Sequence, residues 1–234
     1  MIVLLLALPG CGGSSNQAVS GDPVAAAAGA TSKQPSEKVA LQGKVDLSGQ
    51  TVSLDGNGAF TNSGDRGNLH LVVSIGSFGP GNLEEVFDGK VVWLRSPLLT
   101  STLRGKHWIK LDLAKPAQVL GFDLNALTGQ TPSAALEKLR LDGKVTKLGT
   151  DTIDGVQTTH YRKELSGSYR SVDAWVDGHG LVRRLKLDYD AKVDPTSNQG
   201  AHTVLTMTLS DFGTAVSAPP PPAADVVDSG EVGK

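Results

Sequence analysis

The side chains that most often carry out chemistry are few and scattered along this chain. It contains one cysteine, Cys11, among 234 residues, and a single thiol can form neither an internal disulfide nor a thiolate metal site. No two histidines have the i, i+4 spacing of a zinc-binding helix, and the sequence has no GxSxG elbow, phosphate-binding loop or dinucleotide fingerprint. We therefore predict that the protein is not an enzyme and has no catalytic residues, no metal site and no cofactor. The five histidines are His70, His107, His160, His179 and His202.

The chemistry that remains for Cys11 is covalent modification. Cys11 follows an apolar run and closes the segment Leu8-Pro9-Gly10-Cys11. This segment looks like the lipobox of a bacterial lipoprotein signal peptide, in which the thiol is alkylated with diacylglycerol and the peptide is cut before the cysteine. The resemblance implies that residues 1–10 are a signal peptide, truncated at its start because the basic region of a secretory signal is missing. Cys11 would then be a lipid anchor in the outer face of the cytoplasmic membrane.

Two alternatives for this segment stay open. An ordinary signal peptide cut near an Ala-rich site further on would leave no anchor, and a buried N-terminal strand would make Cys11 a stray thiol. The apolar run is too short to cross a bilayer, which needs about 20 residues, and no other stretch approaches that length.

Composition divides the rest of the chain into three parts. Residues 11–37 are mostly Gly, Ala, Ser, Pro and Gln, which bury too little apolar surface to fold, so we expect a flexible tether. Residues 214–234 are rich in proline and acidic side chains and are expected to form a disordered tail. Residues 38–213 between them have the length of one domain. The net charge of −2 is evenly spread, so no nucleic-acid partner is predicted.

Within residues 38–213 apolar side chains alternate with polar ones, which is typical of β-strands with one buried and one solvated face. Asp-Gly pairs at 88–89, 154–155 and 177–178 separate such stretches and favour tight hairpins. We predict an antiparallel meander of about ten or eleven strands. The clearest alternating segments are 39–47, 52–60, 69–75, 109–113, 181–189 and 205–209.

Residues 115–141 interrupt the alternation. Pro116 and the pair Thr131-Pro132 are suitable helix starts, and apolar residues recur at helical spacing after each of them. We predict two short amphipathic helices that cover the apolar face of the sheet, because their own apolar stripes need burial.

Four segments are similar to the actinobacterial LprG/LppX lipoprotein family, which shares its fold with the carrier LolA and the periplasmic regulator RseB. They are VVWL at 91–94, HWIKL at 107–111, IDGVQTTHY at 153–161 and AWVDGHGLVR at 174–183. The resemblance implies an α+β, mostly antiparallel curved half-barrel whose short helices cover the concave face. It also implies a cavity for an acyl lipid or glycolipid that is carried within the cell envelope, with another envelope protein as a further partner.

The candidate cavity residues are those that the pattern places on the apolar face or under the helices. Arg183, flanked by Leu181 and Leu185, is a candidate contact for an acidic headgroup, or else a strand-end side chain that reaches solvent. Gly56 and Gly58 have the inward parity and allow either curvature or close ligand approach. The apolar face is either a lipid cavity or a close-packed core in a module that docks other envelope proteins. The cavity candidates are Val52, Leu54, Phe60, Leu69, Leu71, Val73, Val91, Trp93, Leu120, Leu124, Leu136, Leu139 and Leu185.

Overall fold

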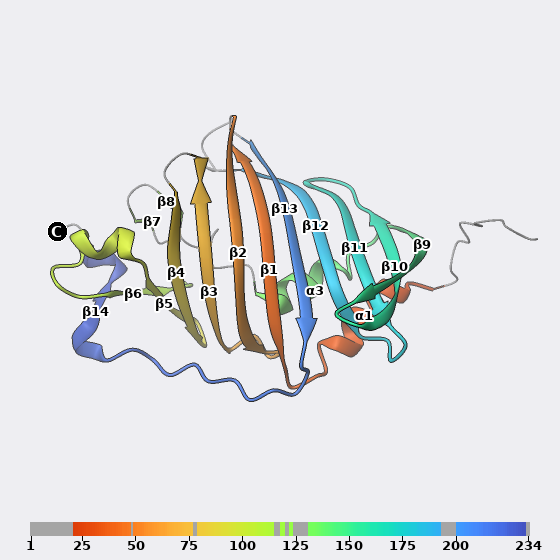
Figure 1. Ribbon diagram of the computed structural model, residues 1–234, viewed down its shortest axis with the longest axis horizontal. Coiled ribbons are helices and arrows are strands. Elements are labelled where there is room, and N and C mark those ends of the chain that lie inside the picture. The colour runs from red at the N-terminus through yellow and green to blue at the C-terminus, as the bar shows by residue number, and fades with distance from the viewer. Residues whose placement is uncertain are drawn as a thin grey trace, which may run out of the picture.

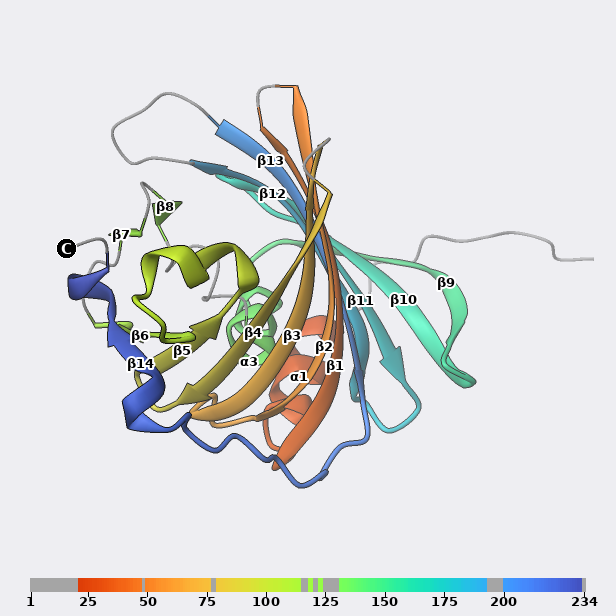
Figure 2. The same ribbon diagram turned by 60° about the vertical axis from the view of Figure 1, so that its left-hand side comes forward.

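The protein folds around one large β-sheet that curves about two short helices (Figures 1 and 2). The computed structural model describes residues 21–47, 49–76, 79–114, 118–119, 122–123, 131–192 and 200–232. Cys11 and the expected signal peptide lie outside this part of the chain. The strands are β1 (Ser36–Leu47), β2 (Gln50–Thr61), β3 (Arg66–Ile75), β4 (Pro80–Asp88), β5 (Val91–Arg95), β6 (Trp108–Asp112), β7 (Gln118–Val119), β8 (Phe122–Asp123), β9 (Lys144–Ile153), β10 (Val156–Glu164), β11 (Tyr169–Asp177), β12 (Val182–Lys192), β13 (Gly200–Ser210) and β14 (Val226–Asp228).

Twelve of these strands form the large sheet, in the order β14-β6-β5-β4-β3-β2-β1-β13-β12-β11-β10-β9. Every pairing is antiparallel except that of β14 with β6, so the fold is mostly antiparallel α+β, as the sequence predicts. Strands β7 and β8 form a separate two-stranded sheet. The described helices are α1 (Pro23–Thr31), the 3-10 helix η2 (Pro97–Thr102), α3 (Pro132–Lys138), and the 3-10 helices η3 (Ala223–Asp225) and η4 (Ser229–Glu231). In the described ranges none of the helices has the length and apolar character needed to cross a bilayer.

The strand faces follow the alternation in the sequence. In β13 every second residue from Ala201 to Leu209 is buried, and the residues between them are half-buried. Asp154 and Gly155, with φ of 48° and 81°, make the tight turn between β9 and β10 that the Asp-Gly pair predicts.

Helix α3 begins at the predicted pair Thr131-Pro132. The Thr131 hydroxyl accepts a hydrogen bond from the N–H of Ala134 at 3.3 Å, and Pro132 begins the helix, where its missing N–H is not needed. Local capping chemistry was therefore enough to locate this element.

The helix predicted after Pro116 is wrong where the structure describes the chain, because β7 and β8 stand there as an antiparallel pair. Gly121 and Asp123 are poor helix formers in this stretch. The other residues of 115–130, including the candidates Leu120 and Leu124, lie outside the described part.

The expected tether ends before residue 37, because α1 is helical and packed. Asp22 caps it by accepting the N–H of Ala25 at 2.9 Å. The helix contacts α3, β11 and β12. This segment has few large apolar side chains, but its small ones are buried because the helix lies close to its neighbours. The buried apolar residues of α1, each at most 3% exposed, are Val24, Ala27 and Ala28.

The expected disordered tail instead runs along the lower side of the sheet in Figure 1, as far as residue 232. Asn68 Nδ2 donates to the Ser217 carbonyl at 2.7 Å, and Ala218 is buried. The tail then adds β14 beside β6, which brings the described sheet to twelve strands where ten or eleven were predicted. A proline-rich segment can lie extended with few partners, so composition alone did not reveal this contact.

Candidate ligand-binding site

The register of the sheet decides which side chains lie on its concave face, toward the two helices. One inward row across β1 to β4 consists of Leu41, Gly56, Leu71 and Leu83. The next row toward the β2–β3 turn continues onto β5 and consists of Val39, Gly58, Leu69, Glu85 and Leu94. The candidates predicted on β2, β3 and β12 all have this inward parity: Val52, Leu54, Phe60, Leu69, Leu71, Val73 and Leu185.

For Val91 and Trp93 of β5 the predicted face is wrong. Their neighbours Val92 and Leu94 are 0% and 2% exposed and pair with inward residues of β4. Val91 and Trp93 are half-buried on the convex face. Four consecutive apolar residues show no alternation, so only the strand pairing reveals which parity faces inward.

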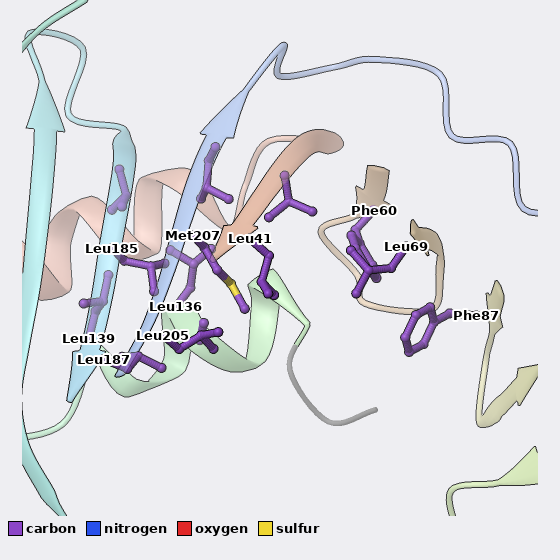
Figure 3. Close-up of a cluster of buried hydrophobic side chains, with 14 of the residues drawn as sticks. Leu41, Phe60, Leu69, Phe87, Leu136, Leu139, Leu185, Leu187, Leu205 and Met207 are labelled. Atoms are coloured by element: carbon purple, nitrogen blue, oxygen red, sulfur yellow. The ribbon is translucent and has the colours of Figure 1, made fainter. Parts of the chain in front are cut away.

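The part of the concave face beside α1 and α3 is closed. Leu136 of α3 and Leu139, its C-cap, are 0% exposed, as are Leu185 of β12 and Met207 of β13. Figure 3 shows Leu136 and Leu139 directed at the side chains of β12 and β13. Leu136, Leu139 and Leu185, predicted as cavity residues, thus belong to a close-packed core in the described structure.

The opposite part of the concave face is less deeply buried, although Leu54, Val73 and Leu83 there still pack against the core. It lies at the end of the sheet that carries the β1–β2 and β3–β4 connections, uppermost in Figure 1. We call it the upper wall. Four of its side chains are half-buried and Ile75 is 36% exposed, whereas Leu69 and Leu71, further down β3, are each 5% exposed. Such an open apolar surface is suited to hydrocarbon. The upper wall consists of Val52, Leu54, Val73, Ile75 and Leu83.

Glu85 of β4 lies one inward row below Leu83 of the upper wall. It is 1% exposed, and neither carboxyl oxygen has a hydrogen-bond partner in the described structure. Its row neighbours are Leu69 and Leu94. Burial in this apolar surrounding raises the pKa of Glu85 from 4.5 to about 8. At neutral pH Glu85 is therefore mainly a neutral acid that can donate one hydrogen bond and accept others.

A second buried carboxyl, Glu37 of β1, lies further down the concave face. It is 0% exposed, and burial raises its pKa from 4.5 to about 7. Asn62 is close enough to oppose part of that shift, although no hydrogen bond of good geometry joins the two side chains. Sequence reasoning missed both glutamates. The available signal was parity, because Glu37 shares that of Val39, and Glu85 shares that of Leu83.

The inward glycines of β2 serve curvature rather than ligand approach. A Cβ on Gly58 would lie 2.0 Å from the carbonyl oxygen of Asn68, and one on Gly56 would lie 2.4 Å from a methyl carbon of Leu71. Neighbouring protein atoms already occupy both positions. These glycines let β2 and β3 approach and bend, and they leave no room for ligand atoms.

Lys163 of β10 is a buried cation on the concave face, and its hydrogen bonds are satisfied. The side chain is 0% exposed, and Nζ donates to the carbonyls of Leu139 and Leu141, each at 2.8 Å. Nζ also pairs with the carboxylate of Asp22, the N-cap of α1. The lysine thus ties the start of α1 to the C-terminal end of α3, where the last carbonyls carry partial negative charge.

Arg183, the candidate headgroup contact, is held within its own turn. Its Nε donates to Asp177 Oδ2 at 2.7 Å, and its guanidinium lies 4.9 Å from the centre of the Phe212 ring. The turn is longer than the predicted Asp-Gly pair, since Gly180 takes the positive φ of 77° and Leu181 N–H also bonds Asp177. The guanidinium is therefore engaged by neighbouring side chains.

Two hollows lie on the convex face of the sheet. One has a volume of about 290 Å³ and is lined by Gln42, Asn57 and His70, among others. The other has a volume of about 450 Å³ and includes Lys44 and Lys186. Both are lined by the mixed polar side chains of a solvated strand face. The described ranges contain no group of three or more side chains suited to hold a metal ion.

Two proteins of Streptomyces are similar to the chain in sequence. One from Streptomyces coelicolor, named "Putative lipoprotein", is 33% identical over 135 residues, which cover 55% of this chain and 44% of that protein. An uncharacterized 31.2 kDa protein of Streptomyces griseus is 27% identical over 159 residues, which cover 55% of this chain and 50% of that protein. The chain thus spans about half the length of the curated relatives it matches. No protein-family model matches it.

Two solved structures resemble the chain at lower sequence identity. LprF from Mycobacterium bovis has a TM-score of 0.49 and 16% identity, covering 85% of this chain and 95% of that one. The Mycobacterium tuberculosis lipoprotein LppX has a TM-score of 0.49 and 14% identity, covering 84% and 96%. Likeness at this level carries no conclusion about function, and the fold of the chain rests on its own strand order and register.

Proposed function

We propose that the protein is an extracytoplasmic lipoprotein, anchored by Cys11, that binds an acyl lipid or glycolipid for carriage within the cell envelope. The observation that carries the proposal is the upper wall, an apolar and partly exposed surface on the concave face, with the buried acid Glu85 one row below it. The name of the Streptomyces coelicolor relative supports the anchor.

The upper wall would bind the hydrocarbon of the ligand. Moving a lipid through water means covering its chains, and burial of roughly 400–600 Å² of acyl surface contributes on the order of 10–15 kcal/mol before the costs of binding. The curved sheet supplies one wall of such a site, and binding removes the half-exposed side chains of that wall from water.

The polar part of the ligand that fits this interior is uncharged. Protonated Glu85 would donate a hydrogen bond to an ester carbonyl or a hydroxyl group. A phosphate or carboxylate would need a cation, and the buried Lys163 already has three partners. The chemistry therefore favours acyl chains joined to a neutral hydrogen-bonding group near Glu85, with any charged headgroup at the open side.

A second candidate function is an envelope docking module of the same fold. It is favoured by the packed core beside α1 and α3, and by the position of the two hollows on the convex face. In that case the convex surface would bind another envelope protein, and the concave face would hold no cargo.

Adjacent valines on β3 separate the two functions. Val73 faces the upper wall, Val72 lines the smaller convex hollow, and both are half-buried. Val73→Asp should abolish retention of noncovalent lipid, because it places a charge among acyl chains, while Val72→Asp should retain lipid as the wild type does. The full chain would be purified from bacterial membranes in mild detergent and studied by native mass spectrometry and lipid extraction.

Thermal melts of both variants provide the control, because Val73 also packs against the hydrophobic core, so loss of lipid is read at a temperature at which Val73→Asp is folded. A wild-type protein without any noncovalent lipid mass, or equal lipid retention in both variants, would contradict lipid carriage. Loss of a co-purifying envelope protein in Val72→Asp alone would support the docking module.

A further inference from the structure

One edge of the large sheet combines exposed leucines with basic side chains. We define the basic edge as residues 140–148, which lead into β9 and form its first half; β9 is an edge strand of the sheet. Leu141 and Leu148 are 42% and 44% exposed, more than any other large apolar side chain in the described ranges. The segment has a net charge of +2 in a chain of net charge −2. Its charged residues are Arg140, Asp142, Lys144 and Lys147.

The basic edge lies where the N-terminal segment joins the domain. Lys163 Nζ bonds both the carboxylate of Asp22 and the carbonyl of Leu141, so these two residues lie within a few ångströms of a single atom. Arg140 also donates to the hydroxyl of Ser32, just after α1, at 3.5 Å. Figure 1 shows α1 and the β9 edge at the same end of the sheet, opposite β6 and β14.

The packing of α1 shortens the connection to Cys11. Eleven peptide steps separate Cys11 from Asp22 (22 − 11), and they span at most about 40 Å even when fully extended. A tether reaching residue 37 would span more than twice that distance. The domain is therefore kept close to whatever holds Cys11, and the basic edge is the surface at the end of the connection.

We propose that the basic edge is the membrane-docking surface of the protein, in which Leu141 and Leu148 enter the headgroup region and Lys144 and Lys147 contact anionic phospholipids. The proposal rests on the anchor at Cys11 that the proposed function includes. Apolar side chains beside lysines match the amphipathic character of a bilayer surface. Lysines on an edge strand also discourage strand pairing, but exposed leucines there would promote it, so protection of the edge does not account for both.

Site-specific fluorescence on the lipidated full chain tests the proposal. Since lipidation blocks Cys11, Leu141→Cys provides one free thiol for an environment-sensitive dye. Leu113→Cys is the matched control, an exposed leucine beyond β6 on the other side of the sheet. The proteins would be reconstituted in phosphatidylcholine vesicles with or without phosphatidylglycerol, and nitroxide-labelled lipid would serve as quencher.

In the anionic vesicles we expect the dye at position 141 to be quenched several-fold more than the dye at position 113. The double substitution Lys144→Glu and Lys147→Glu should remove most of this difference. Equal quenching at the two positions would overturn the proposal. A dye at 141 that is shielded from water but not quenched by the labelled lipid would also overturn it, because that result indicates a protein strand paired with β9. Flotation of the vesicles reports the anchor separately. Protein that does not float refutes the anchor and this proposal together, whereas floating protein with an unquenched dye at 141 refutes the docking surface alone.

Discussion

Glu85 makes the stability of the fold depend on pH in a way that one substitution should remove. Its pKa is raised from 4.5 to about 8 because burial among apolar side chains disfavours the charged form. The folded chain therefore binds this proton more tightly than the unfolded chain. The resulting stabilisation is fully present below about pH 4.5 and is lost as the pH rises through about 8.

The size of the effect follows from the shift. A difference of about 3.5 units (8 minus 4.5), at about 1.36 kcal/mol per unit, corresponds to roughly 4–5 kcal/mol in the free energy of unfolding. Glu85→Gln keeps the shape of the neutral acid and cannot ionise. Near pH 5, the difference in unfolding free energy between Glu85→Gln and wild type reports the cost of the unpaired amide. Between pH 5 and pH 9 this difference should change by roughly 4 kcal/mol in favour of the variant, because only the wild type has a carboxyl group that ionises. Glu37 contributes equally to both proteins and cancels in the difference.

Urea unfolding of delipidated protein at about pH 5, 7 and 9, followed by the fluorescence of the three tryptophans, measures these free energies. Glu84→Gln is the matched control, because Glu84 is the next residue, faces the convex side and binds Arg95 at the surface. The control should change stability by about 1 kcal/mol or less. A difference between Glu85→Gln and wild type that stays constant from pH 5 to pH 9 would refute the burial of a neutral acid at this position.

Two further substitutions test the architecture by chemical denaturation. Gly58→Ala should destabilise the fold by about 1–3 kcal/mol, because the new Cβ meets the carbonyl oxygen of Asn68. Gly178→Ala is the control and should be neutral or stabilising, because a Cβ there meets nothing within 4 Å. Equal effects of the two substitutions would contradict the role of Gly58 in curvature. Lys163→Met should lower the free energy of unfolding by about 1–3 kcal/mol, since it removes the hydrogen bonds that join α1 to the end of α3. Amide hydrogen exchange in both helices should increase. Unchanged exchange in both helices would contradict this role of Lys163.

The sequence was a good guide wherever a single segment carries its own signal. Burial of one strand face leaves an alternation that can be read directly, as in β13, and the Asp154–Gly155 turn follows from the φ angles that this pair adopts. Helix α3 could be located because Thr131 and Pro132 satisfy or remove the first backbone donors without help from other segments. The antiparallel fold class followed from these local features.

The errors concern features that depend on contacts between distant segments. Helix α1 has local signals of its own, an Asp22 N-cap and Pro23 at its first position, but its burial against α3, β11 and β12 depends on contacts that composition does not record. The inward parity of β5 is fixed by pairing with β4 and β6, since its own residues are apolar on both faces. Strand β14 depends in the same way on the free edge of β6.

The hydrogen bonds of the buried ionisable side chains distinguish those with a structural role from those that are candidates for a functional one. Lys163 has three partners, all supplied by the elements it joins, so the fold itself accounts for it. Glu85 has no hydrogen-bond partner in the described structure and Glu37 has only Asn62 nearby, without a hydrogen bond of good geometry, and burying such a carboxyl costs free energy that an apolar side chain in the same place would not. Packing therefore does not explain the presence of an acid at either position. Of the two, only Glu85 adjoins the partly exposed upper wall, so under the proposed function Glu85 is the carboxyl whose missing partner a lipid bound on that wall would supply.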